Sequence, residues 1–175
     1  MALILESDLN SYIDDTSVNP TKAIIVGAAE QVVIDYLGYD PTSATRSYSF
    51  LGTGYDFTVL PVPGASAVAS VKIGDETLDA ALYALDTATN QIVLDDGYYF
   101  TRNAKVVIAY TAGWATIPNA IKLATLRIAA LMYDEAHGNI GITGKQFADL
   151  SKQFINYSNY DKYLRPLSRY RAGGL

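Results

Sequence analysis

The residue types that this chain lacks limit its chemistry. Its 175 residues include no cysteine and one histidine, His137. The absence of cysteine excludes disulfides, thiolate nucleophiles and cysteine-ligated metals. A catalytic triad or a multi-histidine metal site would depend on His137, but Glu135 is two positions away and would point elsewhere on a helix. Because Gly138 follows, we expect His137 to lie at the C-terminal end of a helix and to complement its dipole.

Three short motifs could hold phosphate or calcium. Gly52-Thr53-Gly54 has neither the lysine of a P-loop nor a following helix, so we interpret it as a turn. Asp95-Asp96-Gly97 and Gly74-Asp75-Glu76 lack the alternating acidic spacing of a calcium loop and are predicted to be hairpin turns. A pair of carboxylates that meet only in space, as in glycoside hydrolases, is not recognisable from sequence. The sequence predicts no catalytic residue, no metal ligand and no cofactor, and therefore not an enzyme.

Charge is distributed unevenly along the chain. The net charge is −5, and residues 158–175 carry four cations and one acid: Lys162, Arg165, Arg169, Arg171 and Asp161. This segment therefore has a charge of +3, which leaves −8 for residues 1–157. A basic segment with tyrosines indicates either a docking segment or a solvated, disordered C-terminus. The acidic body disfavours sequence-specific DNA binding, and arginine is favoured at protein interfaces, so a protein partner is the preferred interpretation.

Helix signals predict two N-terminal helices. Residues 6–14 are expected to form the first, with Ser7 as N-cap. Residues 20–37 are expected to form the second, because Asn19 can cap a helix that starts with proline and Gly38 ends it.

The middle of the chain, from about residue 46 to 110, is rich in Val, Tyr, Thr and Phe and has frequent turn signals. Strands are expected at 57–60, 67–73, 81–85, 91–94 and 105–110. Short strands separated by turns predict antiparallel pairing through hairpins. Pro61 and Pro63 place their segment at the edge of the sheet or outside it.

Helical patterns return after the β-region. A long helix is expected over 117–137. Thr143 and Gln146 have capping-box spacing and predict a fourth helix over 144–157. Residues 158–175 show no period and are predicted to form an extended C-terminal tail.

These elements predict an α+β protein. It is a helical bundle of two N-terminal and two C-terminal helices, with an inserted small antiparallel β-region and an extended C-terminal tail. The length indicates one domain, over residues 1–157, followed by the tail at 158–175. No run of 18 apolar residues is present, so no membrane-spanning segment is expected.

The junction between the β-region and the third helix resembles a known family. Residues 106–124 run as a strand that ends in Tyr-Thr-Ala-Gly and an aromatic residue, Trp114, followed by Pro118 and a long helix. This order is similar to that of the head–tail connector (adaptor) proteins of tailed bacteriophages. Residues 7–13 and the run 60–74 are similar to the family as well, so the resemblance covers roughly residues 5–157.

Three residues at this junction are expected to form a structural corner. Gly113 permits a sharp turn out of the strand. Trp114 can fill the corner between sheet and helices or stand exposed as an anchor. Pro118 suits the first turn of the helix.

The resemblance implies a structural virion protein. Members of the family form dodecameric rings beneath the portal of the filled capsid, extend the DNA channel and present a platform for the next neck or tail protein. The implied partners are further copies of the chain, the portal, a downstream neck (stopper) or tail protein, and double-stranded DNA that passes without sequence recognition. The implied location is the neck of the virion, after assembly in the host cytoplasm, with no membrane involved.

The C-terminal segment of such proteins reaches up to the portal. The residues that match this segment, and that the resemblance makes candidates for portal docking, are Tyr160, Tyr163, Leu164, Arg165, Leu167, Arg169, Tyr170 and Arg171.

Two further hypotheses stay open at this point. Another neck or tail-completion protein, such as a stopper or terminator, would share similar parts. A small soluble enzyme or ligand-binding module would instead have a pocket with convergent polar groups and perturbed pKa values.

Overall fold

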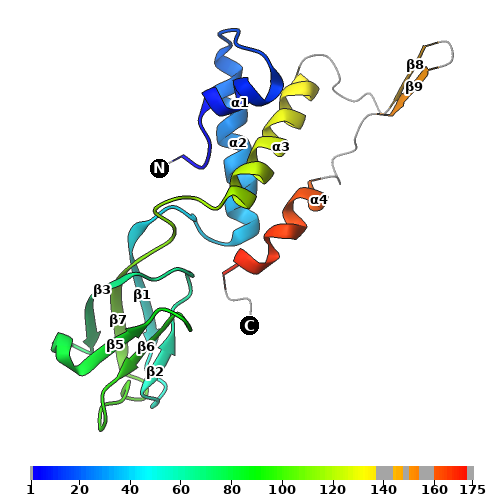
Figure 1. Cartoon of the computed structure of the whole chain (residues 1–175). Coiled ribbons are helices and arrows are strands. Elements are labelled where there is room, and N and C mark those ends of the chain that lie inside the picture. Colours follow the sequence, from blue (N-terminus) through cyan, green and yellow to red (C-terminus); the bar gives the residue numbers. More distant parts are fainter. Residues whose placement is uncertain (1, 137–143, 148–149, 154–159, 173–175) are drawn as a thin grey trace. The chain divides into compact units, whose positions relative to one another are not determined.

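The computed structural model describes residues 2–136, 144–147, 150–153 and 160–172, which divide into two compact units (Figure 1). We call them the α unit, built from Met1–Tyr39 and Ile117–Arg171, and the β unit, built from Asp40–Thr116. The helices belong to the first unit and the two larger antiparallel sheets to the second. The predicted α+β class is confirmed.

Helix α2 (Pro20–Leu37) has the predicted bounds. Asn19 is its N-cap, and the Asn19 side chain accepts a hydrogen bond from the Thr21 N–H at 3.0 Å. Gly38 ends the helix with φ +80°, a left-handed conformation that glycine adopts at little cost. Local chemistry therefore sets both ends of this helix.

Helix α1 (Glu6–Ile13) lies where it was predicted, but the predicted cap is wrong. Ser7 is inside the helix, and Leu5 is the N-cap. The Asp8 carboxylate accepts a hydrogen bond from the Leu5 N–H at 2.8 Å. An anionic side chain in the first turn caps the helix and complements its dipole, which makes the Ser7 hydroxyl unnecessary.

Helix α3 (Asn119–Asp134) begins two residues after the predicted start at 117, and residues 135–136 continue it as a π-helical turn. Pro118 is its N-cap, and the Pro118 carbonyl accepts hydrogen bonds from the N–H groups of Ile121 and Lys122 at 2.9 and 3.2 Å. The buried side of α3 packs chiefly on α2. His137 lies outside the described residues, so its predicted position at a helix end stays a prediction.

Strands β8 (Gly144–Phe147) and β9 (Leu150–Gln153) occupy the segment where a helix was predicted over 144–157. For these residues the prediction is wrong. The two strands pair in antiparallel register, with Lys145 opposite Lys152 and Phe147 opposite Leu150. Apolar residues three positions apart can share a helix face. In a β-hairpin with a two-residue turn, residues with the same spacing lie opposite each other on the two strands. The same spacing therefore fits a hairpin.

The C-terminal segment is helical, and the predicted extended tail is wrong. Residues 161–170 form α4 (Asp161–Leu164) and the 3₁₀ helix η4 (Arg165–Tyr170), which contact α2 and α3. Leu164 and Leu167 are buried, because their three-residue spacing places both on one side of the segment. These two apolar side chains are the physical reason that residues 160–171 join the α unit.

Two antiparallel sheets form the β unit (Figure 1). The first has the strand order β1-β7-β3-β4 and the second β2-β6-β5. The strands and the intervening 3₁₀ helix are β1 (Ala44–Leu51), β2 (Phe57–Val59), β3 (Ala67–Ile73), β4 (Glu76–Thr77), η1 (Ala80–Leu82), β5 (Tyr83–Asp86), β6 (Gln91–Leu94) and β7 (Lys105–Ala112). The predicted antiparallel pairing is confirmed, and β3 and β6 have their predicted bounds.

The core of the β unit contains residues from both sheets. Alternate residues of β7 are buried, as expected for a strand with one face on a core. The fully or nearly fully buried set from β3, β6, β7 and one connecting loop is Val71, Ile92, Leu94, Phe100, Val106, Ile108, Tyr110 and Ala112. This core makes the β unit a small sandwich of two sheets.

The turn predictions have mixed outcomes. Gly74 and Asp75 connect β3 and β4 in a tight hairpin, as predicted. Asp95-Asp96-Gly97 forms a turn, in which the Tyr98 N–H donates to the Asp95 carbonyl at 3.0 Å. This turn leads into a loop that precedes β7 and not into a paired strand, so the hairpin predicted there is wrong.

Candidate docking surface

The C-terminal segment 160–171 is fixed to the α unit by apolar burial and by one long-range hydrogen bond. Leu167 is fully buried and Leu164 is 6% exposed. The Tyr39 hydroxyl donates to the Tyr170 carbonyl at 2.6 Å. Tyr39 follows the end of α2, so this bond ties the last turn of the segment to the second helix of the chain.

Cations stacked on tyrosine rings add to this attachment. The Tyr163 ring has the Arg127 guanidinium 5.6 Å and the Lys162 ammonium 4.7 Å from its centroid. The Arg171 guanidinium lies 5.2 Å from the centroid of the Tyr36 ring. Each such contact contributes about 0.5–1 kcal/mol at an exposed site.

The structure thus divides the residues predicted for portal docking into two groups. Five of them contact the α unit of their own chain: Tyr163, Leu164, Leu167, Tyr170 and Arg171. Arg165 and Arg169 are exposed, and Arg169 also stacks on the ring of the adjacent Tyr170. Tyr160 is half-buried and precedes α4. The outward face of the segment is therefore basic.

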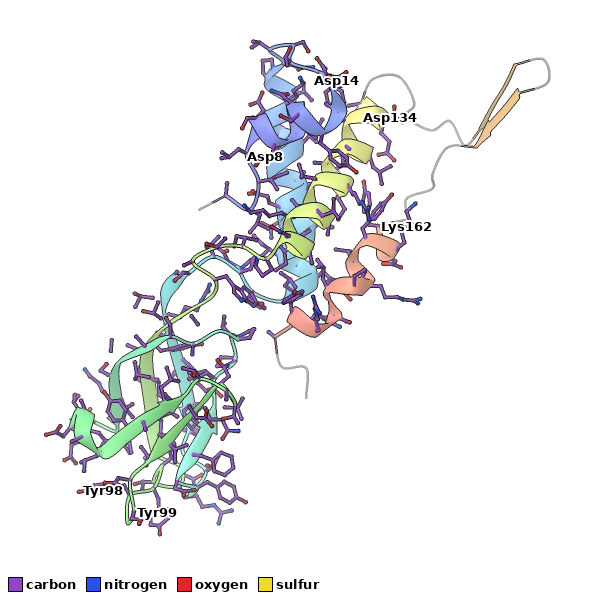
Figure 2. All side chains as sticks on the ribbon, viewed as in Figure 1. Asp8, Asp14, Tyr98, Tyr99, Asp134 and Lys162 are labelled. Atoms are coloured by element: carbon purple, nitrogen blue, oxygen red, sulfur yellow. The ribbon has the colours of Figure 1, made fainter. Side chains whose placement is uncertain are left out.

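A groove runs along the outward face of α3. Figure 2 shows Asp8 on α1 and Lys162 on α4 at the two flanks of α3, and both α1 and α4 contact α3. Two adjoining hollows of about 350 and 480 Å³ share Tyr12. We call them together the α3 groove, lined by Ile4, Asp8, Ser11, Tyr12, Lys122, Leu126, Arg127, Ala130, Leu131, Lys162 and Tyr163.

The charge of the α3 groove is unbalanced. It contains three cations, Lys122, Arg127 and Lys162, and one acid, Asp8. Within the described residues none of these cations forms a salt bridge, and the ion pair that is present joins Lys22 to Asp15. The apolar floor and unpaired cations suit the binding of an apolar segment that carries a carboxylate.

Possible metal ligands do not cluster in the described part of the chain. Within residues 2–136, 144–147, 150–153 and 160–172, no group of three or more His, Cys, Asp or Glu side chains could hold a metal ion. Across the same ranges, no helix has the length and apolar character needed to cross a membrane. The apolar and cationic lining of the α3 groove makes it a candidate binding surface.

Comparison with known families decides how this surface is to be understood. The family model for the head completion protein (HCP) matches residues 6–145, most of the chain. The chain belongs to the head completion protein family. The predicted resemblance to phage head–tail connector proteins is thereby confirmed. Head completion is a structural task, and the family is not one of enzymes.

Solved structures share the fold of this head completion protein. A chain in the neck of an empty GTA particle, computed with C6 symmetry, is 13% identical with a TM-score of 0.61, and the match covers 99% of this chain and 91% of that one. A chain in the virion of a native gene transfer agent (GTA) particle is 12% identical, with a TM-score of 0.63 and the same coverage. A chain in the neck of the native GTA particle, computed with C12 symmetry, is 16% identical, with a TM-score of 0.57 and coverage of 97% and 88%. No curated protein sequence matches the chain.

A buried lysine in this head completion protein was missed by sequence reasoning. Lys22 is fully buried in α2, and its ammonium donates to the carbonyls of Asp15 and Ser17 at 2.7 and 2.8 Å. The Asp15 carboxylate lies 3.3 Å from the same ammonium and accepts a hydrogen bond from the Tyr133 hydroxyl of α3. The Tyr133 bond, together with bonds from Ser17 and Lys22, holds the pKa of Asp15 well below its ordinary value. This cluster joins the α1–α2 loop to α2 and α3.

The predicted corner residues lie where the strand β7 ends. Gly113 has φ +101°, and a Cβ at this position would lie 2.4 Å from the Thr42 carbonyl oxygen, so glycine is required here. Trp114 is half-buried; its N–H donates to the Pro41 carbonyl at 2.9 Å and its own carbonyl accepts from the Ser43 N–H at 3.2 Å. These bonds pin the end of β7 to the residues that precede β1.

An exposed aromatic surface in the β unit was also missed. Its residues are Leu51, Tyr55, Phe57, Tyr98 and Tyr99, each 42–65% exposed. Figure 2 shows Tyr98 and Tyr99 at one end of the β unit. Backbone hydrogen bonds from Gly54 to Phe100 (2.8 Å) and from Phe100 to Tyr55 (2.9 Å) join the two loops that carry it. Rigidly held aromatic side chains of this kind are typical of protein contacts.

Proposed function

We propose that this head completion protein is a structural subunit of the neck of a phage-like particle. It forms a ring beneath the portal, extends the DNA channel and provides the platform for the next neck or tail protein. The observation that carries the proposal is the family match over residues 6–145. The fold similarity to chains from GTA necks supports it, since it spans 97–99% of this chain.

The proposed ring contains twelve copies. Structures of two GTA necks with related chains were computed with C12 and C6 symmetry. Cyclic symmetry around a channel requires each subunit to present two different surfaces, one to each neighbour. In this proposal the chain assembles in the host cytoplasm and resides at the head–tail interface of the virion.

The proposed portal-docking interface is the C-terminal segment, Tyr160 to Arg171. The buried residues Leu164 and Leu167 hold it on the α unit, and Arg165 and Arg169 present charge outward. Arginine can bind carboxylates of a partner through two parallel hydrogen bonds. The basic segment on an otherwise acidic chain thus favours an acidic surface of the portal as its target.

The proposed role toward DNA is passage without recognition. Residues 1–157 carry a charge of −8. Phosphates are retained by clustered lysine and arginine, so an acidic channel wall lets the duplex slide.

Co-sedimentation with the cognate portal tests this proposal. We expect the wild-type chain to bind and the double variant Arg165→Glu/Arg169→Glu to lose binding while it keeps its circular dichroism spectrum. The matched control, Lys72→Glu/Lys105→Glu, alters two exposed cations of the β unit and is expected to bind normally. The connector assignment would be overturned in favour of a stopper or terminator if the wild-type chain does not co-sediment with the portal but binds a downstream neck component.

A further inference from the structure

Helix α2 is buried on one side and exposed on the opposite side within the described part of the chain. Its buried side consists of Lys22, Ile25, Val26, Ala29, Val33 and Leu37. We call the opposite, exposed side the α2 stripe, formed by Ile24, Gly27, Ala28, Gln31 and Asp35. Ile24 is 71% exposed. The first half of the α2 stripe, Ile24, Gly27 and Ala28, is apolar and is not covered by any part of the chain that the structure describes. An exposed apolar face of this kind is typical of a contact with another chain.

Gly27, in the middle of the α2 stripe, points independently to a partner. A Cβ at this position would meet nothing within 4 Å, and its φ is not in the left-handed region. Glycine in a helix interior destabilises the helix by roughly 0.5–1 kcal/mol relative to alanine, and none of the described residues requires it here. A glycine without an internal reason is expected where another backbone approaches closely.

The α3 groove lies on the other side of the α unit. The buried residues of α3, among them Ile121 and Ile128, face α2. The groove residues lie on the opposite, outward side of α3. The α2 stripe and the α3 groove are therefore two different surfaces on opposite sides of one unit. A contact between two different surfaces of identical subunits is heterologous and can close into a ring.

We propose that the α2 stripe of one copy packs into the α3 groove of the next copy, with both helices along the ring axis. This inference rests on the proposed function and names the contact that closes its ring. Small side chains at Gly27 and Ala28 let the α2 backbone approach the apolar floor of the groove, an example of a helix bound in a groove. The Asp35 carboxylate accepts a hydrogen bond from the Gln31 amide at 2.7 Å and supplies a negative charge to the groove cations, which form no salt bridge with a described residue.

The levels of the two helices predict which residues meet. In one chain, the Lys22 ammonium lies 5.5 Å from the centroid of the Tyr133 ring, so residues 22 and 133 are level on α2 and α3. The two helices run in opposite directions (Figure 1). At about 1.5 Å per residue, Ala28 is level with Arg127, and Asp35 is within one turn of Lys122. A ring rotation about an axis along the helices preserves these levels in the neighbouring copy.

Cysteine cross-linking tests the contact directly, because the chain has no cysteine of its own. The double variant Ala28→Cys/Arg127→Cys, carried in purified particles, is oxidised or treated with a short bismaleimide and run on a denaturing gel. The two sites are separated by two helices of about 10 Å diameter each, so a link forms only between chains. We expect a ladder of covalent oligomers, and monomers alone for either single variant.

The remaining outcomes separate this inference from the proposed function. Particles that contain the double variant but yield only monomers would overturn the contact and leave the neck assignment intact. Particles that never contain the wild-type chain would overturn both.

A charge swap provides the second measurement. Asp35→Lys and Lys122→Asp are each expected to lower incorporation into particles about tenfold, since like charges face each other across the contact, and the double variant is expected to restore it. Glu6→Lys, which alters an exposed acid of α1, is the matched control and is expected to incorporate normally. Failure of the double variant to restore incorporation would contradict the predicted pairing.

Discussion

Lys22 shows how a single residue can hold several elements together. Its ammonium bonds two carbonyls of the α1–α2 loop and pairs with Asp15, which in turn binds Tyr133 of α3. A fully buried ammonium is tolerated only when its donors find acceptors, and here they do. We therefore expect this cluster to stabilise the end of the α unit where the α1–α2 loop lies.

Replacing Lys22 with methionine is expected to lower the free energy of unfolding by about 3 kcal/mol, because the two carbonyls and Asp15 lose their partner. Urea denaturation monitored by circular dichroism measures this change. Lys72→Met, at an exposed site, is the control and is expected to change stability by less than about 0.5 kcal/mol. Equal stability of the two variants would show that the cluster is dispensable.

The same cluster makes stability depend on pH. Hydrogen bonds from Tyr133, Ser17 and Lys22 hold the pKa of Asp15 below its ordinary value of 3.8. A carboxyl whose pKa is lower in the folded state stabilises the fold above its unfolded pKa, and this contribution is lost as the pH falls. The melting temperature should therefore drop on acidification from about pH 7 to pH 3, and drop less in Tyr133→Phe. An identical drop in the two proteins would exclude Asp15 as a source.

Several residues that act locally could be identified from sequence, although the predicted Ser7 cap was wrong, and residues that act at a distance could not. Asn19, Gly38 and Gly113 were predicted correctly, because caps and turns depend on neighbours along the chain. Lys22 was not, since its role depends on Tyr133, which lies far along the sequence. The sequence does not show whether a lysine in an apolar helix is buried, because its hydrogen-bond acceptors, here the carbonyls of Asp15 and Ser17, are placed only by the fold.

Among the elements, the C-terminal segment and the β8–β9 hairpin were predicted wrongly. Strand β1 was not predicted, and the strand predicted over 81–85 is divided between η1 and β5. The bounds of α2 followed from its Asn19 cap and Gly38, and those of β3 and β6 from the turn signals that flank these short strands. The segments β8–β9 and α4–η4 are short, and their apolar spacing of three residues fits more than one structure. Whether residues 161–170 fold back onto α2 and α3 depends on a surface that other parts of the chain create.

Leu167→Ala tests the attachment of the C-terminal segment. Leu167 is fully buried, so we expect the variant to lower the free energy of unfolding by about 2–4 kcal/mol, through lost apolar burial and the cavity left behind. The exposed neighbour Ser168 provides the control, Ser168→Ala, with little expected change. Limited proteolysis should cut the Leu167→Ala segment faster, and unchanged protection would show that the segment does not depend on this side chain.

Gly27→Ala separates the stability of helix α2 from its proposed contact. The new Cβ meets nothing within the chain, so the isolated protein should gain roughly 0.5–1 kcal/mol of stability. The packed interface is expected to lose affinity, since the added methyl group prevents close approach of the neighbouring chain. Thermal melts of the free protein and its yield in particles measure the two effects. A variant that is both more stable and fully incorporated would argue against close packing at Gly27.

At the scale of the whole molecule, the acidic body and basic C-terminal segment fit a component that contacts proteins and lets DNA pass. In the proposed ring, the α unit uses two opposite surfaces for neighbouring copies and a third, at Arg165 and Arg169, for the portal. The β unit adds an exposed aromatic surface. Because the chain belongs to the head completion protein family, we propose that all of these surfaces contact other proteins at the junction between head and tail.

Cryo-electron microscopy of particles that carry this chain tests the central claim most directly. We expect a ring of twelve copies, coaxial with the portal and open to the DNA channel, with Arg165 and Arg169 against the portal. Reconstruction of the neck without imposed symmetry would reveal it. Density for the chain as isolated single copies, or at a site away from the head–tail junction, would contradict the claim.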